Sequence, residues 1–255
     1  MITFLKQFIS RQFLYPKVRI PSGRNLCDQV VIVTGAGRGI GKAIAEMIYA
    51  EGGSVVAVSR RLRSLEEAFP HVESKRFVFA EGDVSDEQTV RSIVLSARKK
   101  FGKVDVLVNN AGINMVEKPL EEISAEDFDR MVATNIRGAF LFSKGVIPLM
   151  KNAASGFIIT IGSKISHNTN VGPSKTVYAM TKYALEGFSF ALNRELKSYG
   201  IRVSCLMPGT VNTFASLNSK QFLSPYQVAE IVCMMIRYED IDFESVVLKS
   251  KKQNI

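Results

Sequence analysis

Residues 29–45 read QVVIVTGAGRGIGKAIA, a run of β-branched residues that passes into glycines and then into a helical pattern. The run 29–33 predicts a buried strand, and the residues after it predict a turn and a helix. Glycines at such a junction let the backbone turn tightly and approach a phosphate, whose charge the helix N-terminus stabilises. The residues of the turn are Gly35, Gly37, Arg38, Gly39, Ile40 and Gly41. The stretch therefore predicts the start of a dinucleotide-binding α/β fold.

The same alternation continues along the rest of the chain. The expected strands are residues 29–33, 54–58, 77–80, 104–108, 157–161, 202–207 and 245–248. The expected helices are residues 40–50, 87–100, 125–150, 177–199 and 225–238. A repeated order of strand, helix and strand predicts right-handed crossovers and a doubly wound parallel sheet, the Rossmann fold. We expect a single domain, residues 28–248, between an N-terminal extension, 1–27, and a basic tail, 249–255.

The composition is that of a globular protein in a reducing compartment. The 255 residues are 46% hydrophobic, and no apolar run approaches the roughly 18 residues of a membrane span. The three cysteines are far apart and match neither a disulfide framework nor a metal site. Eight of the 33 basic residues lie outside the first and last acids, which leaves 25 against 24 acids in the body. The net charge of +9 therefore belongs to the ends, and we expect no nucleic-acid partner.

The first 24 residues form a basic amphipathic segment. Ile2, Leu5, Ile9 and Phe13 recur at helical spacing until Pro16, and no acid is present. This pattern is typical of a mitochondrial leader or of a helix that lies on an anionic membrane surface. It also fits a flexible extension or a helix packed on another subunit, which we favour. We therefore expect a cytoplasmic location, with the mitochondrial matrix as the alternative.

The end of the second strand predicts which dinucleotide binds. About 20 residues beyond the glycines, an acid would accept hydrogen bonds from the adenosine ribose of NAD. The chain instead reads VSRR over residues 58–61. Ser59 can donate to a 2′-phosphate, Arg60 can grip it, and Arg38 can close from the other side. The sequence therefore predicts NADP(H), unless Arg60 and Arg61 are only solvated charges at the start of a helix.

Further motifs carry a resemblance to a known family. They are Asn109-Asn110-Ala111-Gly112 after the fourth strand, Asn135 in a long helix, Ser163 after the fifth strand, Tyr178-x-x-x-Lys182, and Pro208-Gly209 after the sixth strand. With the glycine turn, and in this order, they make the chain resemble a short-chain dehydrogenase/reductase over residues 29–248. The resemblance implies hydride exchange between a nicotinamide and a carbonyl or alcohol substrate.

The spacing of Tyr178 and Lys182 also has a chemical meaning of its own. Residues at i and i+4 share a helix face, so the ammonium can lie near the phenol. One charge at about 4 Å, in an effective dielectric of about 20, favours phenolate by up to about 4 kcal/mol and lowers a phenol pKa from about 10 toward about 7. Tyr178 would then exchange a proton with a substrate oxygen that Ser163 also binds. Taken alone, the pair is more typical of a half-buried ring with a snorkelling amine.

The resemblance assigns the remaining roles in the site. It implies that Lys182 also holds the nicotinamide ribose and that Asn135 positions a water that relays protons through this lysine. Asp83 and Val84 match the family position beside the adenine, although by sequence alone Asp83 fits a helix cap equally well. The other cofactor contacts that the resemblance implies come from Asn109, Ala111 and Gly112 beside the adenosine ribose, and from Pro208, Gly209, Val211 and Thr213 toward the nicotinamide.

Two departures from the family pattern concern the substrate. Ser163 precedes Tyr178 by 15 positions, where about 13 is more usual, so the loop 164–177 is slightly enlarged. The link 214–224 is shorter than the lid of many relatives, and the C-terminus lacks the Gly-Gly and extension of many acyl-carrier reductases. The short link favours a small or exposed carbonyl, or one at the end of a long carrier.

We expect an NADP(H)-dependent oxidoreductase that acts on a small ketone, aldehyde, 3-oxoacid or 3-hydroxyacid. The alternative enzyme is a 3-oxoacyl thioester reductase. A third alternative is an NADPH-binding sensor or scaffold, which the intact set of Ser163, Tyr178, Lys182 and Asn135 argues against. By analogy with relatives that pair through helices 125–150 and 177–199, we expect a homodimer or homotetramer.

Overall fold

The computed structural model of the chain describes residues 26–72, 75–114, 118–167, 171–213 and 222–251. Within these residues seven parallel strands form one sheet in the order β3-β2-β1-β4-β5-β6-β7. The strands are β1 (Val30–Thr34), β2 (Ser54–Ser59), β3 (Phe77–Glu81), β4 (Val106–Asn109), β5 (Gly156–Ile161), β6 (Ile201–Pro208) and β7 (Ser245–Leu248). The order reverses between β1 and β4, which confirms the predicted doubly wound sheet. The predicted N-terminal amphipathic segment and most of the link 214–224 lie outside the described residues.

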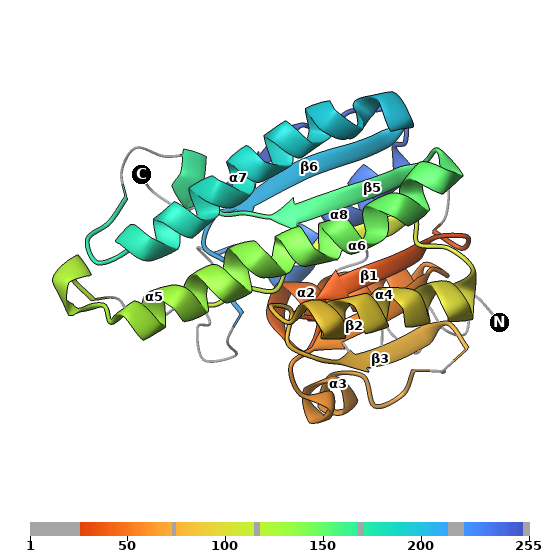
Figure 1. Cartoon of the computed structure of the whole chain (residues 1–255), viewed down its shortest axis with the longest axis horizontal. Helices are drawn as coiled ribbons and strands as arrows, with labels where there is room; N and C mark the ends of the chain where they lie inside the picture. Colours follow the sequence, from red (N-terminus) through yellow and green to blue (C-terminus); the bar gives the residue numbers. More distant parts are fainter. Residues whose placement is uncertain (1–25, 73–74, 115–117, 168–170, 214–221, 252–255) are drawn as a thin grey trace.

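Helices cover both faces of the sheet (Figure 1). They are α2 (Gly39–Ala50), α3 (Leu62–Ala68), α4 (Glu87–Phe101), α5 (Ala125–Val132), α6 (Gly138–Ala153), α7 (Thr176–Leu196) and α8 (Pro225–Arg237). Helices α4, α6 and α7 pack on one face, and α2, α3 and α8 pack on the other. Each face of the sheet has its own hydrophobic core, and alternate residues of β1 point into one or the other. Ile32 lies in the core under α4, α6 and α7, and Val31 and Val33 lie in the core under α2, α3 and α8. Buried on both faces, the strands read as continuous apolar runs.

The predicted helices differ from the structure at two places. The segment 125–150 was expected to be one helix, but a π turn, Ala133–Arg137, separates α5 from α6. A π turn inserts an extra residue into the helical ladder and often marks a functional position. Helix α3 was missed because it is only seven residues long and buries only Leu65 and Ala68, too few for a helical period to be recognised.

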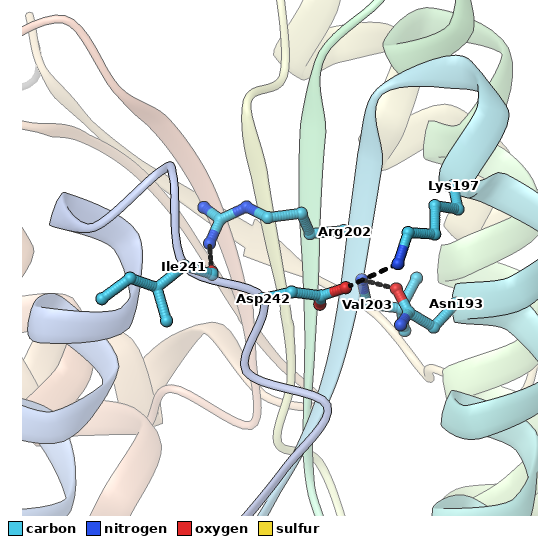
Figure 2. Close-up of polar contacts among 6 residues, drawn as sticks. All are labelled: Asn193, Lys197, Arg202, Val203, Ile241 and Asp242. Atoms are coloured by element: carbon cyan, nitrogen blue, oxygen red, sulfur yellow. Dashed lines mark hydrogen bonds and ion pairs between the residues drawn. The ribbon is translucent and has the colours of Figure 1, made fainter.

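A cluster of polar contacts lies at the amino-terminal ends of β5 and β6 (Figure 2). Arg202 donates through Nη1 to the carbonyl oxygens of Tyr238 at 3.0 Å and of Ile241 at 2.9 Å. Its guanidinium also lies 4.0 Å from the centroid of the Phe157 ring. Lys197 pairs with Asp242 at 3.5 Å. These contacts fasten the segment that connects α8 to β7, at the end of the sheet opposite to the sequence motifs.

Candidate active site

The glycine turn and the Asn-Asn-Ala-Gly motif form one packed unit at the carboxyl ends of β1 and β4. Gly35 has a φ of +66°, and a Cβ there would lie 2.9 Å from the Cα of Ala111. A Cβ on Gly41 would meet both the Asn110 amide and the carbonyl of Gly35. Asn110 Nδ2 donates to the carbonyl of Thr34 at 2.8 Å. Side chains are therefore excluded at these two glycines by the close approach of β4.

Thr34 completes this unit, although the sequence analysis did not single it out. Its Oγ1 accepts from the backbone N–H of Asn110 at 2.9 Å and of Ala111 at 3.0 Å, and donates to the carbonyl of Val108 at 3.3 Å. The threonine therefore fixes the loop after β4 to the end of β1. The sequence feature that could have indicated this role is the hydroxyl residue at the end of the first apolar run.

The N-terminus of α2 fits a phosphate ligand. Its N-cap, Arg38, is extended and makes no side-chain cap, as is also true at α3 and α7, whereas α4, α5 and α8 are capped by Asp86, Ser124 and Ser224. Helix α2 also has no acid in its first turn. Uncapped N–H groups and the positive end of the helix dipole suit a pyrophosphate. The start of α2 can therefore accept an anionic group such as a phosphate.

At the expected adenosine end of the site, the pairing of β2 with β3 brings an acidic residue close to Ser59, which the sequence motifs did not predict. Ser59 ends β2, where a Cβ on Gly37 would lie 3.0 Å from its Oγ, and Arg60 beside it is exposed. The Cα partner of Ser59 on β3 is Glu81. The Glu81 carboxylate accepts from the backbone N–H of Leu62 at 3.0 Å, so it serves the start of α3. Strand pairing, which the sequence does not specify, brings this carboxylate near the predicted 2′-phosphate position.

Asp83 is not the cap of the helix that follows it. Its Oδ1 accepts from the backbone N–H of Ser85 at 2.8 Å and from the Ser85 hydroxyl at 2.7 Å. The cap of α4 is Asp86, which accepts from Thr89 N at 2.7 Å. The cap alternative for Asp83 was therefore wrong, while its proposed adenine contact stays a prediction. Val84 beside it is buried against Gly138 of α6.

Asn135 lies on the π turn, buried between the loop after β4 and helix α7. Its Oδ1 accepts from the backbone N–H of Ile113 at 2.8 Å. Its Nδ2 donates to the carbonyl of Ile113 at 3.0 Å and to the hydroxyl of Thr181 at 3.1 Å. The expected conflict between an asparagine amide and the helix backbone is thus resolved by contacts with two other segments.

Ser163, Tyr178 and Lys182 come together next to this asparagine. The side chains of Ser163 and Tyr178 form a hydrogen bond. Lys182 is 6% exposed, its Nζ donates to the carbonyl of Ile161 at 3.0 Å, and it lies 5.7 Å from the centroid of the Tyr178 ring. A Cβ on Gly112 would lie 3.4 Å from Asn135 Oδ1 and 3.8 Å from Lys182 Nζ. The four predicted catalytic side chains therefore share one region.

The pKa prediction for the phenol was wrong in direction. Burial raises the pKa of Tyr178 above 10.0, and the hydrogen bond from Ser163 only opposes this rise. Burial also lowers the pKa of Lys182 to about 8. The spacing of the two residues specifies one charge pair, but it does not specify the loss of hydration that both groups undergo in the fold. Desolvation, which depends on tertiary structure, is the largest influence on the pKa of both groups.

A small cavity of about 70 Å³ opens beside Tyr178. It is lined by Asn114, Lys118, Ile123, Asp127, Met131, Ser174, Val177 and Tyr178. Asp127 already pairs with Arg130 at 2.9 Å. Ser174 has a φ of +61°, which is uncommon for a residue other than glycine. The cavity therefore combines an apolar wall with several polar groups, and its volume suits a ligand of a few heavy atoms.

The remaining predicted residues lie at the same edge of the sheet. Asn109 is buried, and its Nδ2 donates to Ser143 Oγ at 3.0 Å, while its Oδ1 has no hydrogen-bond partner among the described residues. Pro208 ends β6, and the N–H of Gly209 donates to the carbonyl of Leu248 at 2.8 Å. Val211 pairs with Leu223 across the base of the link, and a Cβ on Gly39 would lie 3.2 Å from Thr213 Cγ2. The segment after β6 thus reaches over the glycine turn.

The described part of the chain contains no group of three or more His, Cys, Asp and Glu side chains arranged to hold a metal ion. None of its helices is both long enough and apolar enough to cross a membrane.

Comparison with known proteins identifies clear relatives. The family model described as short chain dehydrogenase matches residues 29–223. An uncharacterized oxidoreductase of Staphylococcus aureus strain USA300 is 32% identical over 211 residues, which cover 81% of this chain and 90% of that protein.

Solved structures agree with the sequence matches. An alcohol dehydrogenase from the archaeon Thermococcus sibiricus, complexed with 5-hydroxy-NADP, has a TM-score of 0.81 and 28% identity, over 89% of this chain and 98% of that chain. A 3-ketoacyl-(acyl-carrier-protein) reductase from Brucella melitensis, complexed with NADH, has a TM-score of 0.81 and 29% identity, with the same coverage of 89% and 98%.

Proposed function

The chain belongs to the short-chain dehydrogenase family and is an oxidoreductase of that family, and from this premise we propose that it uses NADP(H) to interconvert a small carbonyl compound and its alcohol. The observation that carries the proposal is the hydrogen-bonded pair of Ser163 and Tyr178 beside the buried Lys182. These groups border a small cavity at the edge of the sheet where the uncapped helix α2 begins. A donor, a polarising hydroxyl and a cation in this arrangement suit carbonyl chemistry.

Tyr178 is the proposed proton donor. Because burial raises its pKa, the phenol stays protonated at neutral pH and is ready to donate to a carbonyl oxygen. Ser163 donates a hydrogen bond to the same oxygen and so fixes the carbonyl beside the phenol. The ammonium of Lys182 stabilises the phenolate that remains after proton transfer, and Asn135 positions the group that returns the proton through this lysine. NADPH, when bound, supplies the hydride for reduction of the carbonyl carbon.

The binding of NADP(H) is assigned to residues along the carboxyl edge of the sheet. The glycine turn and the start of α2 would hold the pyrophosphate. Ser59, Arg60 and Arg38 would bind the 2′-phosphate, and Asp83 and Val84 the adenine. The alcohol dehydrogenase from Thermococcus sibiricus, complexed with 5-hydroxy-NADP, supports this choice, while the Brucella melitensis reductase was complexed with NADH. Positions 59–61 hold no acid, and the nearby Glu81 carboxylate already accepts from the N–H of Leu62, which favours the phosphorylated form.

Among small carbonyl compounds we favour those that carry a carboxylate, the 3-oxoacids and 3-hydroxyacids. Lys118 lines the cavity beside Tyr178 and, within the described residues, has no carboxylate within ion-pair distance. The other charged group of the lining, Asp127, is paired with Arg130. Among the described lining residues, Lys118 is therefore the only charged group outside an ion pair, and it would attract an anionic substrate.

Two alternatives each have an observation in their favour. The likeness to the Brucella melitensis reductase supports 3-oxoacyl thioester reduction, in which only the end of a long carrier would enter the site. The intact dinucleotide edge is compatible with an NADPH-binding sensor without turnover. The second alternative does not account for the buried contacts that hold Asn135 and Lys182 beside Tyr178.

A carbonyl panel would test the proposal. The purified full-length protein is mixed with NADPH and with neutral ketones, aldehydes, 3-oxoacids and a 3-oxoacyl thioester, and NADPH absorbance is followed. We expect turnover of at least one small compound and its loss in Tyr178→Phe, with NADPH affinity retained. Tight NADPH binding with no turnover would favour the sensor, and turnover of the thioester alone would favour the carrier reductase.

We also propose that the protein assembles into a homodimer or homotetramer through α6 and α7. Large apolar side chains are exposed on these helices, with Phe140 on α6 and Tyr183 and Phe190 on α7. Light scattering of the purified protein would give the mass of the assembly. Phe190→Glu should dissociate it, because a carboxylate would lose its hydration in an apolar interface.

A cytoplasmic location stays a prediction, with the mitochondrial matrix as its alternative. Fusion of residues 1–24 to a fluorescent reporter would decide between them, since a leader would direct the reporter to mitochondria.

A further inference from the structure

Thr181 lies at the centre of the hydrogen bonds that join the segments of the site. It is fully buried on α7, one residue before Lys182. Its hydroxyl donates to the carbonyl of Tyr178 at 2.8 Å and accepts from Asn135 Nδ2 at 3.1 Å. One hydroxyl therefore connects the helical turn that carries Tyr178 to the π turn that carries Asn135.

The other contacts of Asn135 fix the orientation of its side-chain amide. Its Oδ1 accepts from Ile113 N and its Nδ2 donates to Ile113 O, so the backbone of Ile113 decides which way the amide faces. An amide nitrogen has two hydrogens, and the second is directed to Thr181 Oγ1. Without a hydroxyl at position 181, a buried N–H would have no acceptor, and the amide would have to move to find one.

We propose that Thr181 is a positioning residue of the reaction, which acts through Asn135 and Tyr178 and does not touch the substrate. The proposal rests on the proposed function, because it gives Thr181 the task of holding two groups that take part in proton transfer. A displacement of about 1 Å in such a group can reduce a rate by about 100-fold. The hydroxyl, rather than the bulk of the side chain, performs this task.

Helix α7 offers a matched control in Ser189. Its hydroxyl is buried and donates to the carbonyl of Leu185 at 2.8 Å, a bond of the same kind as that of Thr181. Two turns farther along the helix, Ser189 makes no contact with Asn135 or Tyr178 in the described structure. Ser189 also hydrogen-bonds the side chain of Cys205. Its removal should therefore reproduce the loss of a buried helical hydroxyl without the loss of a contact to Asn135 or Tyr178.

The test compares Thr181→Val, Thr181→Ser and Ser189→Ala in the full-length protein. The readouts are kcat and KM for the best substrate of the panel, the pH profile of kcat, the Kd for NADPH and the thermal midpoint. We expect kcat of Thr181→Val to fall by about 10- to 100-fold, with KM and Kd within about threefold of wild type and an altered pH profile. Thr181→Ser should retain kcat within about twofold, because serine keeps the hydroxyl, and Ser189→Ala should change only the thermal midpoint.

Two results would overturn the proposal: an unchanged kcat and pH profile in Thr181→Val, or an equal loss of kcat in Thr181→Ser. If Thr181→Val does not fold, Thr181→Ala replaces it, since the smaller side chain removes the hydroxyl without a new methyl contact. Failure of the proposed function is distinguishable, because it would be seen as a wild-type protein that binds NADPH and reduces nothing in the panel.

Discussion

Two cations, the buried Lys182 and the half-buried Arg202, lie at opposite ends of neighbouring strands and show that the protein uses charge differently in its two regions. Lys182 donates to the carbonyl at the end of β5, and Arg202 donates from the start of β6 to the carbonyls of Tyr238 and Ile241. Burial lowers the pKa of both groups. Three carboxylates, those of Glu239, Asp242 and Asp240, oppose the effect at Arg202. At Lys182, within the described residues, only the thiol of Cys205 does so.

This difference indicates that the charge of Arg202 serves the stability of the fold, whereas the charge of Lys182 can interact with a group in the site. The charge of Arg202 is balanced by its surroundings, so its main effect is on the stability of the fold. The charge of Lys182 is poorly balanced, and this costs stability while the site holds no other negative group. A phenolate on Tyr178, formed during reduction, would supply the missing partner. The predictions that follow test this distinction.

The largest effect is expected when each cation is replaced by methionine. In Lys182→Met, kcat should fall by about 1000-fold, within the range of about 10²- to 10⁴-fold seen when acid–base catalysis is lost. In Arg202→Met, kcat should stay within about twofold, while the free energy of unfolding falls by about 2 kcal/mol because two carbonyls lose a charged donor. Steady-state kinetics and urea unfolding measure both effects. Comparable losses of kcat in the two variants would remove the distinction.

The next effect concerns pH and stability. The pKa of Lys182 is lowered from 10.5 to about 8, so between these pH values the unfolded chain binds more protons than the folded chain. The free energy of unfolding should therefore rise with pH across this window, by up to about 3 kcal/mol from this group. Lys182→Met lacks the contribution, so wild type should gain stability over the variant between pH 7.5 and pH 10. Parallel curves in urea titrations would contradict the assigned burial of the charge.

A slightly smaller change in free energy is expected when the residues that are proposed to select NADPH over NADH are replaced. The double variant Ser59→Asp, Arg60→Ala removes one phosphate donor and the guanidinium, and adds an acceptor for the ribose hydroxyl. We expect the ratio of NADPH to NADH affinity to fall by about 100-fold, which corresponds to about 2.7 kcal/mol. Arg61→Ala is the control, since Arg61 is exposed at the start of α3. Titration of cofactor fluorescence gives both constants, and an unchanged NADPH affinity in the double variant would reject the assignment.

The smallest effect is expected at the rim of the cavity. Lys118→Met keeps the length of the side chain and removes its charge, so KM for a 3-oxoacid should rise about tenfold, or about 1.4 kcal/mol. KM for a neutral ketone of similar size should stay within about twofold. Kinetics with a matched acid and ketone would show the selectivity, and an equal rise for both compounds would show that Lys118 does not select for charge.

Much of the fold was predictable because it depends on local patterns. The apolar runs gave all seven strands to within one or two residues, and the glycine stretch gave the junction of β1 and α2. The spacing of Tyr178 and Lys182 predicted a shared helix face, and both do lie on α7. The cap of α4 was harder to assign, since Asp83 and Asp86 are both acids shortly before a helix and only hydrogen-bond geometry distinguishes them.

The sequence by itself determined the seven strands and most of the helices, the family and the identity of the proposed catalytic groups, because each follows from residue types in local patterns. Tertiary structure alone decided the π turn at Asn135, the contact of that residue with Thr181, the position of Glu81 beside Ser59 and the burial of Lys182. These features join segments that are far apart in the chain, and desolvation depends on everything that surrounds a group. No local pattern contains that information, which is why the phenol pKa inferred from spacing was wrong in direction.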